Sequence, residues 1–361
     1  MRLGRRVLVG LLASVTVAGS LSGCVSQGHQ VGVSLILKTL TNPYFVAMRE
    51  AAQAEADKAG VKLSVAAGTM DGDTQNQINE VYTAIARGDK GILITSNGNS
   101  VNAAIRLARA NGLYVIALDT PPIPADTTDN TYATDNVQAG RLIGQYTAAR
   151  LGGKKAVIAM LDLYNDQVAS VDIGRDHGFL EGMGIDPGSD SVNAQEARSG
   201  SYKGAGGGSG GDYEIACHQP TQGAVDGGRT AMEQCLSARP DINVVYSVNE
   251  PAGMGAYAAL QAAGATKKAF IVSIDGSCSG MQAVQDGVFA ADATQYPGKM
   301  ASLGVQAVVA LAKGEKPPGV TPGKTFLDTG TNLVATQVPN GVQAQSVEQG
   351  RSACWGSTDA A

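Results

Sequence analysis

From about residue 30 onward, short apolar runs rich in β-branched residues alternate with longer stretches in which alanines and other apolar residues recur every three or four positions. The first pattern is typical of strands buried on both faces, and the second of amphipathic helices. The strands predicted in this way are 31–37, 61–67, 91–95, 114–119, 156–161, 213–217, 244–248, 270–275 and 291–295. Their alternation with helical stretches predicts an α/β fold with parallel sheets covered by helices on both faces.

The clearest helical stretch is 43–59, where Phe45 and Met48 recur on the same face. Pro43 is tolerated in a first helical turn, and Asn42 before it is a residue type that caps helix N-termini. The sequence therefore predicts a helix that begins shortly after the first strand.

The predicted strands form two groups, one before and one after the Pro- and Asp-rich stretch 121–130. Two doubly wound lobes are more economical than one very wide sheet. We expect the Gly-rich stretch 199–211 to be a flexible surface loop, and the polar stretch from residue 343 to be irregular and held by Cys354. The glycines are not followed by the Gly-Lys-Ser/Thr of a phosphate-binding loop.

The N-terminus, residues 1–23, has the features of an export signal: arginines precede an apolar stretch that is short for a transmembrane helix. It ends in Leu21-Ser22-Gly23-Cys24, which resembles a bacterial lipobox. We therefore predict that Cys24 is lipidated and that residues 24–30 form a tether. The alternatives are an ordinary signal peptide with a chance cysteine, or an internal membrane anchor; the paired arginines are a weak indication of twin-arginine export.

Charge and composition exclude several classes of protein. The chain has 27 Lys+Arg and 32 Asp+Glu, a formal net charge of −5, which argues against nucleic-acid binding. Its hydrophobic fraction of 43% argues against intrinsic disorder. With only 3 histidines, we expect no metal site and no histidine-relay enzyme.

Apart from Cys24, the chain contains four cysteines, an even number that predicts two disulfides in an exported protein. Three pairings are possible. We favour Cys217–Cys235, which flanks one loop-and-helix segment, and Cys278–Cys354, which would tether the C-terminal tail. The alternative is that all four are unpaired small hydrophobic residues.

Polar and aromatic side chains follow the predicted strands at the edge of the sheets where ligands gather in α/β folds. Carboxylates and amides hydrogen-bond hydroxyl groups, and aromatic faces cover the apolar surface of a sugar ring. Any one of these residues is more often a turn or cap residue, but together they predict a site for a polyhydroxylated ligand. The residues are Asn42, Tyr44, Phe45, Asn97, Asn99, Asp119, Asn249, Asp275 and Gln295.

Several motifs, in order along the chain, give it a resemblance to a known family. They are 38–45 (KTLTNPYF), 115–121 (VIALDTP), 133–136 (ATDN), 248–251 (VNEP), 273–276 (SIDG) and 295–297 (QYP). Over residues 30–340 the chain resembles periplasmic-binding proteins of the ribose/fructose type, the solute receptors of ABC sugar importers. The stretches 159–163 and 249–252 are most similar to the fructose-binding subgroup.

The resemblance implies two Rossmann-like lobes, joined by a three-strand hinge, that close over one monosaccharide or related polyol. The expected N-terminal lobe is 31–130 plus 296–324, the C-terminal lobe 131–295 plus 325–342, and the tail 343–361. It also implies an extracytoplasmic monomer that delivers its ligand to an ABC permease and, through it, to the ATPase subunit, without a cofactor. The lipobox-like sequence adds the expectation that a lipid on Cys24 anchors the protein to the outer face of the bacterial cell membrane.

The resemblance further implies that an arginine of the second lobe contacts sugar, and Arg175 is the best match. In the ribose-binding member, an aromatic ring from the second lobe stacks on the sugar. The matching loop of this chain, 218–223, has no aromatic residue, and we expect Gln219 or Gln222 to contact the sugar in its place. The family motif Thr-Pro-x-Asp is replaced by Thr95-Ser96-Asn97-Gly98, so an acidic partner for a ring hydroxyl is lost. A different ketose, a pentose or an open-chain sugar alcohol is therefore a candidate ligand.

Three other functions have sequence features for or against them. The stretch 276–280 (GSCSG) resembles a nucleophile elbow with Cys278 at its centre, but no histidine is placed to activate it. A sugar-responsive repressor would have a basic helix-turn-helix where this chain has an export signal. A receptor for a small signalling molecule, or for chemotaxis, remains as the alternative.

Overall fold

The computed structural model describes Met1 and residues 30–204 and 208–357. The predicted lipidation site Cys24 and almost all of the signal and tether lie outside the described residues. The segments Met1–Gln30 and Val31–Ala361 form separate units, and the description below concerns the second. In the described part of the chain, no helix is both long and apolar enough to span a bilayer.

The first lobe is built on a six-stranded sheet with the order β12-β5-β4-β3-β1-β2, in which every described ladder is parallel. Its strands are β1 (Gly32–Leu37), β2 (Lys62–Ala67), β3 (Gly91–Ile94), β4 (Tyr114–Leu118), β5 (Asn130–Ala133) and β12 (Leu327–Asp328).

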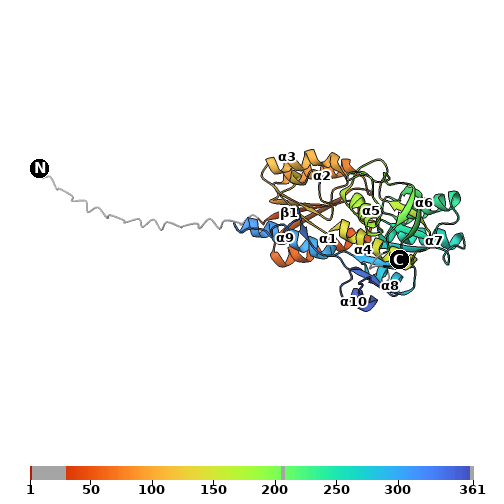
Figure 1. Cartoon of the computed structure of the whole chain (residues 1–361). Coiled ribbons are helices and arrows are strands. Elements are labelled where there is room, and N and C mark those ends of the chain that lie inside the picture. Colours follow the sequence, from red (N-terminus) through yellow and green to blue (C-terminus); the bar gives the residue numbers. More distant parts are fainter. Residues whose placement is uncertain (2–29, 205–207, 358–361) are drawn as a thin grey trace. The chain divides into compact units, whose positions relative to one another are not determined.

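Helices cover both faces of this sheet. The helices α1 (Pro43–Ala59) and α9 (Pro297–Ala312) share a core with one face, although they lie far apart in the sequence (Figure 1). The helices α2 (Thr74–Arg87) and α3 (Asn102–Ala110) share a core with the other face. The short 3-10 helices η1 (Asn99–Val101) and η2 (Ala125–Thr127) complete the lobe.

The second lobe contains a seven-stranded sheet with the order β13-β11-β10-β9-β6-β8-β7, parallel except for the edge strands β7 and β13. Its strands are β6 (Ala156–Asp162), β7 (Ser199–Tyr202), β8 (Gly211–Pro220), β9 (Val244–Ser247), β10 (Phe270–Asp275), β11 (Phe289–Thr294) and β13 (Leu333–Ala335). Its helices are α4 (Asn136–Leu151), α5 (Ser170–Gly182), α6 (Val225–Ala238), α7 (Glu250–Ala262), α8 (Cys278–Gln285) and α10 (Val347–Arg351).

The chain crosses between the two sheets three times: between β5 and α4, between β11 and α9, and between β12 and β13. The predicted fold of two parallel α/β lobes is confirmed. The strands β5 and β12 both lie in the first sheet. The expected second lobe began at residue 131 and resumed at residue 325, and so it included most of β5 and all of β12. The two strands lie in the first sheet because β5 pairs with β4 and β12 pairs with β5 along their backbones.

Helix α1 begins and ends as the sequence predicts. The Asn42 side chain accepts a hydrogen bond from the backbone N–H of Tyr44 at 2.9 Å, and Pro43 occupies the first turn. Gly60 ends the helix with a φ of 69°, a conformation that favours glycine. This cap fixes the direction in which the first helical turn faces.

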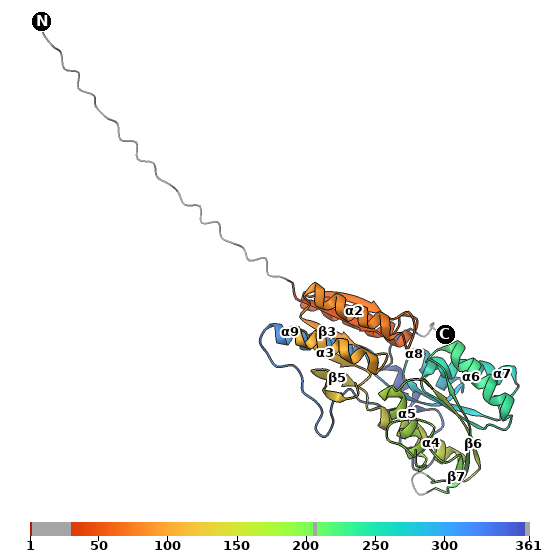
Figure 2. The same cartoon turned by 90° about the horizontal axis from the view of Figure 1, so that it is seen from above.

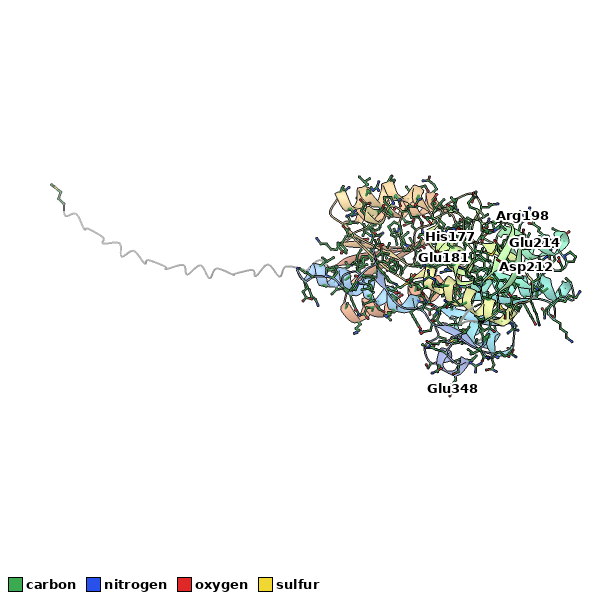
Figure 3. All side chains as sticks on the ribbon, in the orientation of Figure 1. His177, Glu181, Arg198, Asp212, Glu214 and Glu348 are labelled. Carbon is green, nitrogen blue, oxygen red and sulfur yellow. A yellow bond between two sulfur atoms is a disulfide. The ribbon has the colours of Figure 1, made fainter. Side chains whose placement is uncertain are left out.

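Two stretches that were expected to be irregular each contain one regular element. In the Gly-rich stretch, Ser199–Tyr202 forms the strand β7, which pairs antiparallel with β8, and the hydroxyl of the buried Tyr202 donates to the Lys154 carbonyl oxygen at 2.8 Å. In the tail, α10 forms behind a capping box at Ser346, with Val347 buried and Glu348 exposed (Figure 3).

Both predicted disulfides are present. Cys217–Cys235 joins β8 to α6, and Cys278–Cys354 joins the start of α8 to the tail. The second bridge closes a span of 76 residues, and it tethers the segment that carries Trp355.

Glycines allow α4 and α5 to lie side by side with their backbones in close approach (Figure 2). A Cβ atom at Gly140 would lie 2.2 Å from the Arg175 carbonyl oxygen, and one at Gly144 would lie 2.1 Å from that of Phe179. Side chains at these positions would push the two helices apart. The packing therefore fixes the position of α5, the helix that carries Arg175.

We expect Gly144→Ala to lower the free energy of unfolding by about 3 kcal/mol, because the backbone oxygen that its Cβ meets cannot move without displacing α5. Gly298→Ala is the control, since its Cβ would meet its nearest neighbour, the Ala51 Cβ, at 3.4 Å. That variant should change stability by less than about 0.5 kcal/mol. Urea denaturation measures both, and equal stabilities would show that the helix contact is not tight.

Candidate functional site

The carboxyl ends of the strands in both lobes border three adjoining cavities. A small inner chamber of about 30 Å³ lies between the lobes, a wide cavity of about 640 Å³ adjoins it, and a side cavity of about 480 Å³ lies beside both. Asp71 lines all three. Together they form a cleft lined from both lobes.

The inner chamber brings together most of the side chains that the sequence singled out, from both lobes. Asn42, Tyr44, Phe45, Asp119, Arg175, Asn249, Asp275 and Gln295 all line it. Gln222 lies next to the chamber instead, in the lining of the wide and side cavities.

In the first lobe, Asp119 comes directly after β4 and has a φ of 64°, in the left-handed region that is rare for residues other than glycine. Its side chain is buried and accepts a hydrogen bond from the Thr120 hydroxyl at 2.8 Å. Backbone conformations of this kind cost free energy and concentrate at functional sites.

In the second lobe, Arg175 is 5% exposed and held by two hydrogen bonds. Its Nε donates to the Asn136 side chain, and its Nη1 donates to the Val248 carbonyl oxygen, both at 2.8 Å. Within the described residues, its Nη2 has no hydrogen-bond partner. The guanidinium is therefore fixed in place with a donor to spare.

Asp275 lies at the end of β10 within a buried hydrogen-bond network. Its carboxylate accepts from the Gln295 side-chain amide at 2.9 Å and from the Glu250 backbone N–H at 3.2 Å. Burial, and then the charge of Glu250, raise the pKa of Asp275 from its ordinary value to about 8. Burial likewise raises the pKa of Asp71. A ligand that hydrogen-bonds these carboxylates would replace water that burial has removed.

The structure places Asn97 and Asn99 away from the cleft, contrary to expectation. Asn97 is buried and bound to the backbone: its Oδ1 accepts from Gly72 N–H at 3.0 Å, and its Nδ2 donates to the carbonyl oxygens of Lys38 and Asp73. Asn99 begins η1 and is exposed. Asn97 therefore has a structural position and Asn99 a surface position; β3 ends at Ile94, one residue earlier than predicted.

The cleft residues that sequence reasoning missed include Lys38, Asp71 and Trp355. Asp71 and Lys38 follow strands, so the rule that selected the other residues would have found them. Trp355 comes from the C-terminal tail, where no sequence pattern points to it. Its indole N–H donates to the Asp275 carbonyl oxygen at 3.1 Å, and its ring meets that of Tyr44 edge to face, with 5.4 Å between centroids.

Among the described residues, hydrogen bonds join the lobes across the cleft, two of them donated by hydroxyl groups of the second lobe. The Tyr164 hydroxyl of the second lobe donates to the Asp71 carboxylate of the first at 2.8 Å. The Ser170 hydroxyl donates to the Pro121 carbonyl oxygen at 2.6 Å. These contacts hold the lobes together in the conformation that the structure describes.

Similarity to known proteins agrees with this architecture. A family model described as a periplasmic binding protein domain matches residues 33–316. The chain is 30% identical over 312 residues to the ribose import binding protein RbsB of Salmonella typhimurium, covering 84% of this chain and 93% of that protein. It is 27% identical over 273 residues to the D-apiose import binding protein of Actinobacillus succinogenes, covering 75% and 77% of the two chains. The chain therefore belongs to the type I periplasmic binding proteins, the class that includes the receptors of sugar importers.

Solved structures share its fold. A protein from Mycobacterium smegmatis in complex with β-D-fucofuranose has a TM-score of 0.70 and 22% identity, covering 90% of this chain and 93% of that one. An ABC transporter solute binding protein from Bacillus halodurans with bound myo-inositol has a TM-score of 0.70 and 16% identity, covering 90% and 98%.

Cys278 forms a disulfide with Cys354 and therefore has no free thiol. The stretch 276–280, which resembles a nucleophile elbow, thus has no nucleophile at its centre. The neighbouring Ser277 caps α8 through a hydrogen bond from the Gly280 N–H and donates its hydroxyl to the buried Glu250. These residues therefore serve the packing of α8 against α7.

We expect the protein without ligand to lose stability as pH rises from about 4 to about 8, in part through Asp275. A carboxyl whose pKa is raised in the folded state binds a proton there over a range where the unfolded chain has lost it. In Asp275→Asn this contribution is absent, so the decline should be less steep by about 1 kcal/mol per pH unit. Urea denaturation at a series of pH values measures the slopes, and identical slopes would contradict a buried, proton-binding Asp275.

Proposed function

We propose that this chain is the extracytoplasmic substrate-binding component of an ABC importer. It captures a monosaccharide, or a related sugar alcohol, between its two lobes and releases it unchanged to a membrane permease. The observation that carries the proposal is the convergence of carboxylates, amides, one arginine and aromatic rings from both lobes in a single chamber. The binding functions in the names of its relatives support it.

The roles of the side chains follow from their chemistry. Asp119 and Asp275 accept hydrogen bonds from ligand hydroxyls, and Arg175 donates to ligand oxygens. Asn42, Asn249 and Gln295 both donate and accept, as hydroxyl groups require. Gly98 stands where the family motif Thr-Pro-x-Asp has its aspartate, so that acidic group is missing. Asp71, which the sequence reasoning missed, supplies an acidic group in the cleft instead.

Aromatic rings line one side of this cleft. Tyr44 and Phe45 lie edge to face, with 5.3 Å between their centroids, and Trp355 contacts Tyr44 from the wide cavity. Ring faces of this kind cover the C–H surface of a sugar. We propose that Trp355 supplies part of the stacking surface that the second lobe provides in the ribose-binding member.

The mechanism is hinge closure. The inner chamber of about 30 Å³ is much smaller than the cavities of about 300–1,000 Å³ that hold small molecules, so the lobes must separate for a sugar to enter. The sugar then binds one lobe, and contacts from the other stabilise the closed form. Asn249 and Asp275 of the second lobe therefore act mainly on closure.

The closed form docks on the permease, whose ATPase drives import. A lipid on Cys24 would hold the receptor at the outer face of the membrane, beside that permease. Both parts of this proposal rest on the family and on the lipobox-like sequence.

We expect Asp119→Ala to weaken sugar binding by at least about 100-fold, because it leaves ligand hydroxyls buried without a charged acceptor. The ligand is first found by a thermal-shift screen of pentoses, hexoses, ketoses and polyols, since a bound ligand raises the melting temperature. Calorimetry then compares the variant with wild type. Asn99→Ala, at an exposed position outside the cleft, is the control and should bind as wild type does.

The outcomes separate the possibilities. Wild-type affinity in Asp119→Ala would remove this residue from the site. A screen in which no polyhydroxylated compound raises the melting temperature would overturn the sugar-binding proposal in favour of a signalling receptor. Recovery of a chemically altered sugar would show an enzyme instead.

We expect Tyr164→Phe to weaken sugar binding by about 5- to 100-fold, since closure would bury Asp71 without its hydroxyl partner. Tyr202→Phe is the matched control: it also removes a phenol hydroxyl, but that hydroxyl bonds within the second lobe. The fluorescence of Trp355, the single tryptophan of the chain, reports binding. Equal loss in both variants would indicate general destabilisation instead of a lost contact between lobes.

A further inference from the structure

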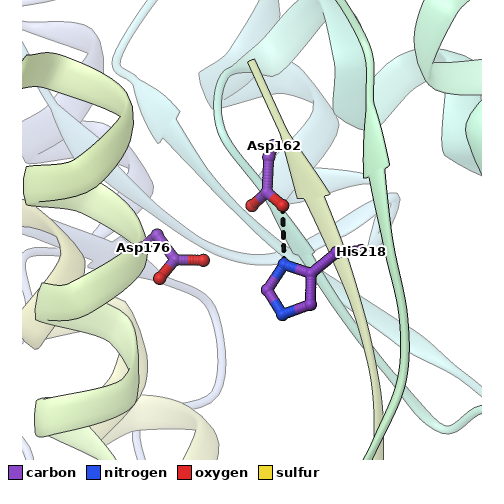
Figure 4. Close-up of side chains that lie close together, drawn as sticks. All are labelled: Asp162, Asp176 and His218. Atoms are coloured by element: carbon purple, nitrogen blue, oxygen red, sulfur yellow. Dashed lines mark hydrogen bonds and ion pairs between the residues drawn. The ribbon is translucent and has the colours of Figure 1, made fainter. Parts of the chain in front are cut away.

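A second cluster of buried polar groups lies in the second lobe, among residues that do not line the cleft. Asp162 ends β6, Asp176 lies on α5, His218 lies on β8, and Glu196 precedes β7. Figure 4 shows the carboxylates of Asp162 and Asp176 turned towards the imidazole of His218. One atom from each of these three residues lies within 4.8 Å of the others.

The imidazole of His218 lies between two carboxylates. Its Nδ1 is 2.7 Å from Asp162 Oδ2, and its Nε2 is 2.6 Å from Glu196 Oε1. The side chains of Asp162 and Glu196 are 5% and 3% exposed, and that of His218 is 18% exposed. The ring is therefore fixed from both sides, with a narrow opening to solvent.

Asp176 is the anomaly in this cluster. Its side chain is fully buried, yet neither carboxylate oxygen has a hydrogen-bond partner among the described residues. The Nε2 of His177 is 4.0 Å from Asp176 Oδ1, too far for a hydrogen bond, and 3.2 Å from the Val192 carbonyl oxygen. A buried carboxylate without a partner costs several kcal/mol, so its retention here needs an explanation.

The cluster has more negative charge than the protein neutralises. Asp162 Oδ1 and Glu196 Oε2 are also buried without hydrogen-bond partners among the described residues. Burial lowers the pKa of His218, but hydrogen bonds to Asp162 and Glu196 and their charges raise it to about 10. Burial, and then the charge of Asp162, raise the pKa of Asp176 well above its ordinary value. Three carboxylates around one imidazole are an environment that attracts a cation.

We propose that Asp162, Asp176 and His218 bind a divalent transition-metal ion, Zn²⁺ or Mn²⁺, and that Glu196 orients the histidine. One imidazole nitrogen with carboxylate oxygens is a donor set suited to these ions. Glu196 would accept the Nε2–H of His218, which leaves the Nδ1 lone pair directed at the metal, as in many histidine sites. From the sequence we expected no metal site because histidines are few, but this site requires only one.

The geometry requires a small rearrangement. Ligands about 2.0–2.1 Å from a tetrahedral ion are about 3.4 Å apart. The cluster would contract around Asp176, and the Nδ1 of His218 would separate slightly from Asp162 as the metal replaces the proton between them. The ion would then link β6, α5 and β8. It would thereby stabilise the position of α5, on which Arg175, the residue before Asp176, lines the cleft.

The test uses the full chain with its disulfides intact, freed of metal with a chelator and without sugar. Addition of ZnCl₂ or MnCl₂ at one hundred times the dissociation constant should raise the melting temperature of wild type by about 5 °C or more. Calorimetry should find one ion per chain. CaCl₂ and MgCl₂, which prefer sites made of oxygen alone, should have much weaker effects.

Asp176→Asn should abolish the metal-dependent rise in melting temperature. In chelator it should melt at or above the wild-type temperature, because an amide at this buried position cannot ionise, and added Zn²⁺ or Mn²⁺ should produce no shift. Asp286→Asn, which removes an exposed carboxylate of the same lobe, should respond to metal as wild type does. If Asp176→Asn fails to fold, His218→Gln decides by the same measurements.

A wild-type protein that neither Zn²⁺ nor Mn²⁺ stabilises would overturn the proposal. So would a variant, Asp176→Asn or His218→Gln, that keeps the full metal-dependent shift, since the ion would then bind elsewhere. Neither result would affect the sugar-binding proposal, which concerns other residues.

Discussion

The binding site depends on the free-energy cost of burying carboxylates between the two lobes. Asp71, Asp119 and Asp275 line one small chamber with Arg175 and Lys38. Water is largely excluded from the chamber, so each acidic group needs a hydrogen-bond donor from the protein or from a ligand. In the described conformation, protein groups such as Thr120, Tyr164 and Gln295 supply donors. A sugar offers several hydroxyl donors at once, which is why its arrival can favour closure.

Helix α5 connects the two polar regions of the second lobe. The neighbouring residues Arg175 and Asp176 point to different surroundings, one towards the cleft and the other towards the cluster around His218. Consecutive residues of a helix are about 100° apart around its axis, so one helix can serve both regions. The glycines of α4 and α5 allow the close packing that fixes this helix, and both regions depend on it.

The C-terminal tail is part of the site. The Cys278–Cys354 bridge ties it to the start of α8, and Trp355 lies next to Asp275 and Tyr44. A short tail without the bridge would have little buried surface to hold it. A residue more than 300 positions from Tyr44 thereby becomes part of the wall of the cleft.

The sequence by itself determined the alternation of strands and helices, the cap of α1, both disulfide pairs and most residues of the inner chamber. These features depend on local patterns: apolar periodicity, capping residues, cysteine spacing and the positions just after strands. It also singled out Asn97 and Asn99, which the structure places outside the linings of the cleft, because the same residue types also cap turns and hold backbone in place. Only the tertiary structure decided that Trp355 borders the cleft and that Asp162, Asp176 and His218 meet. Those contacts join segments far apart along the chain, and no local pattern specifies which distant side chains will share a buried space.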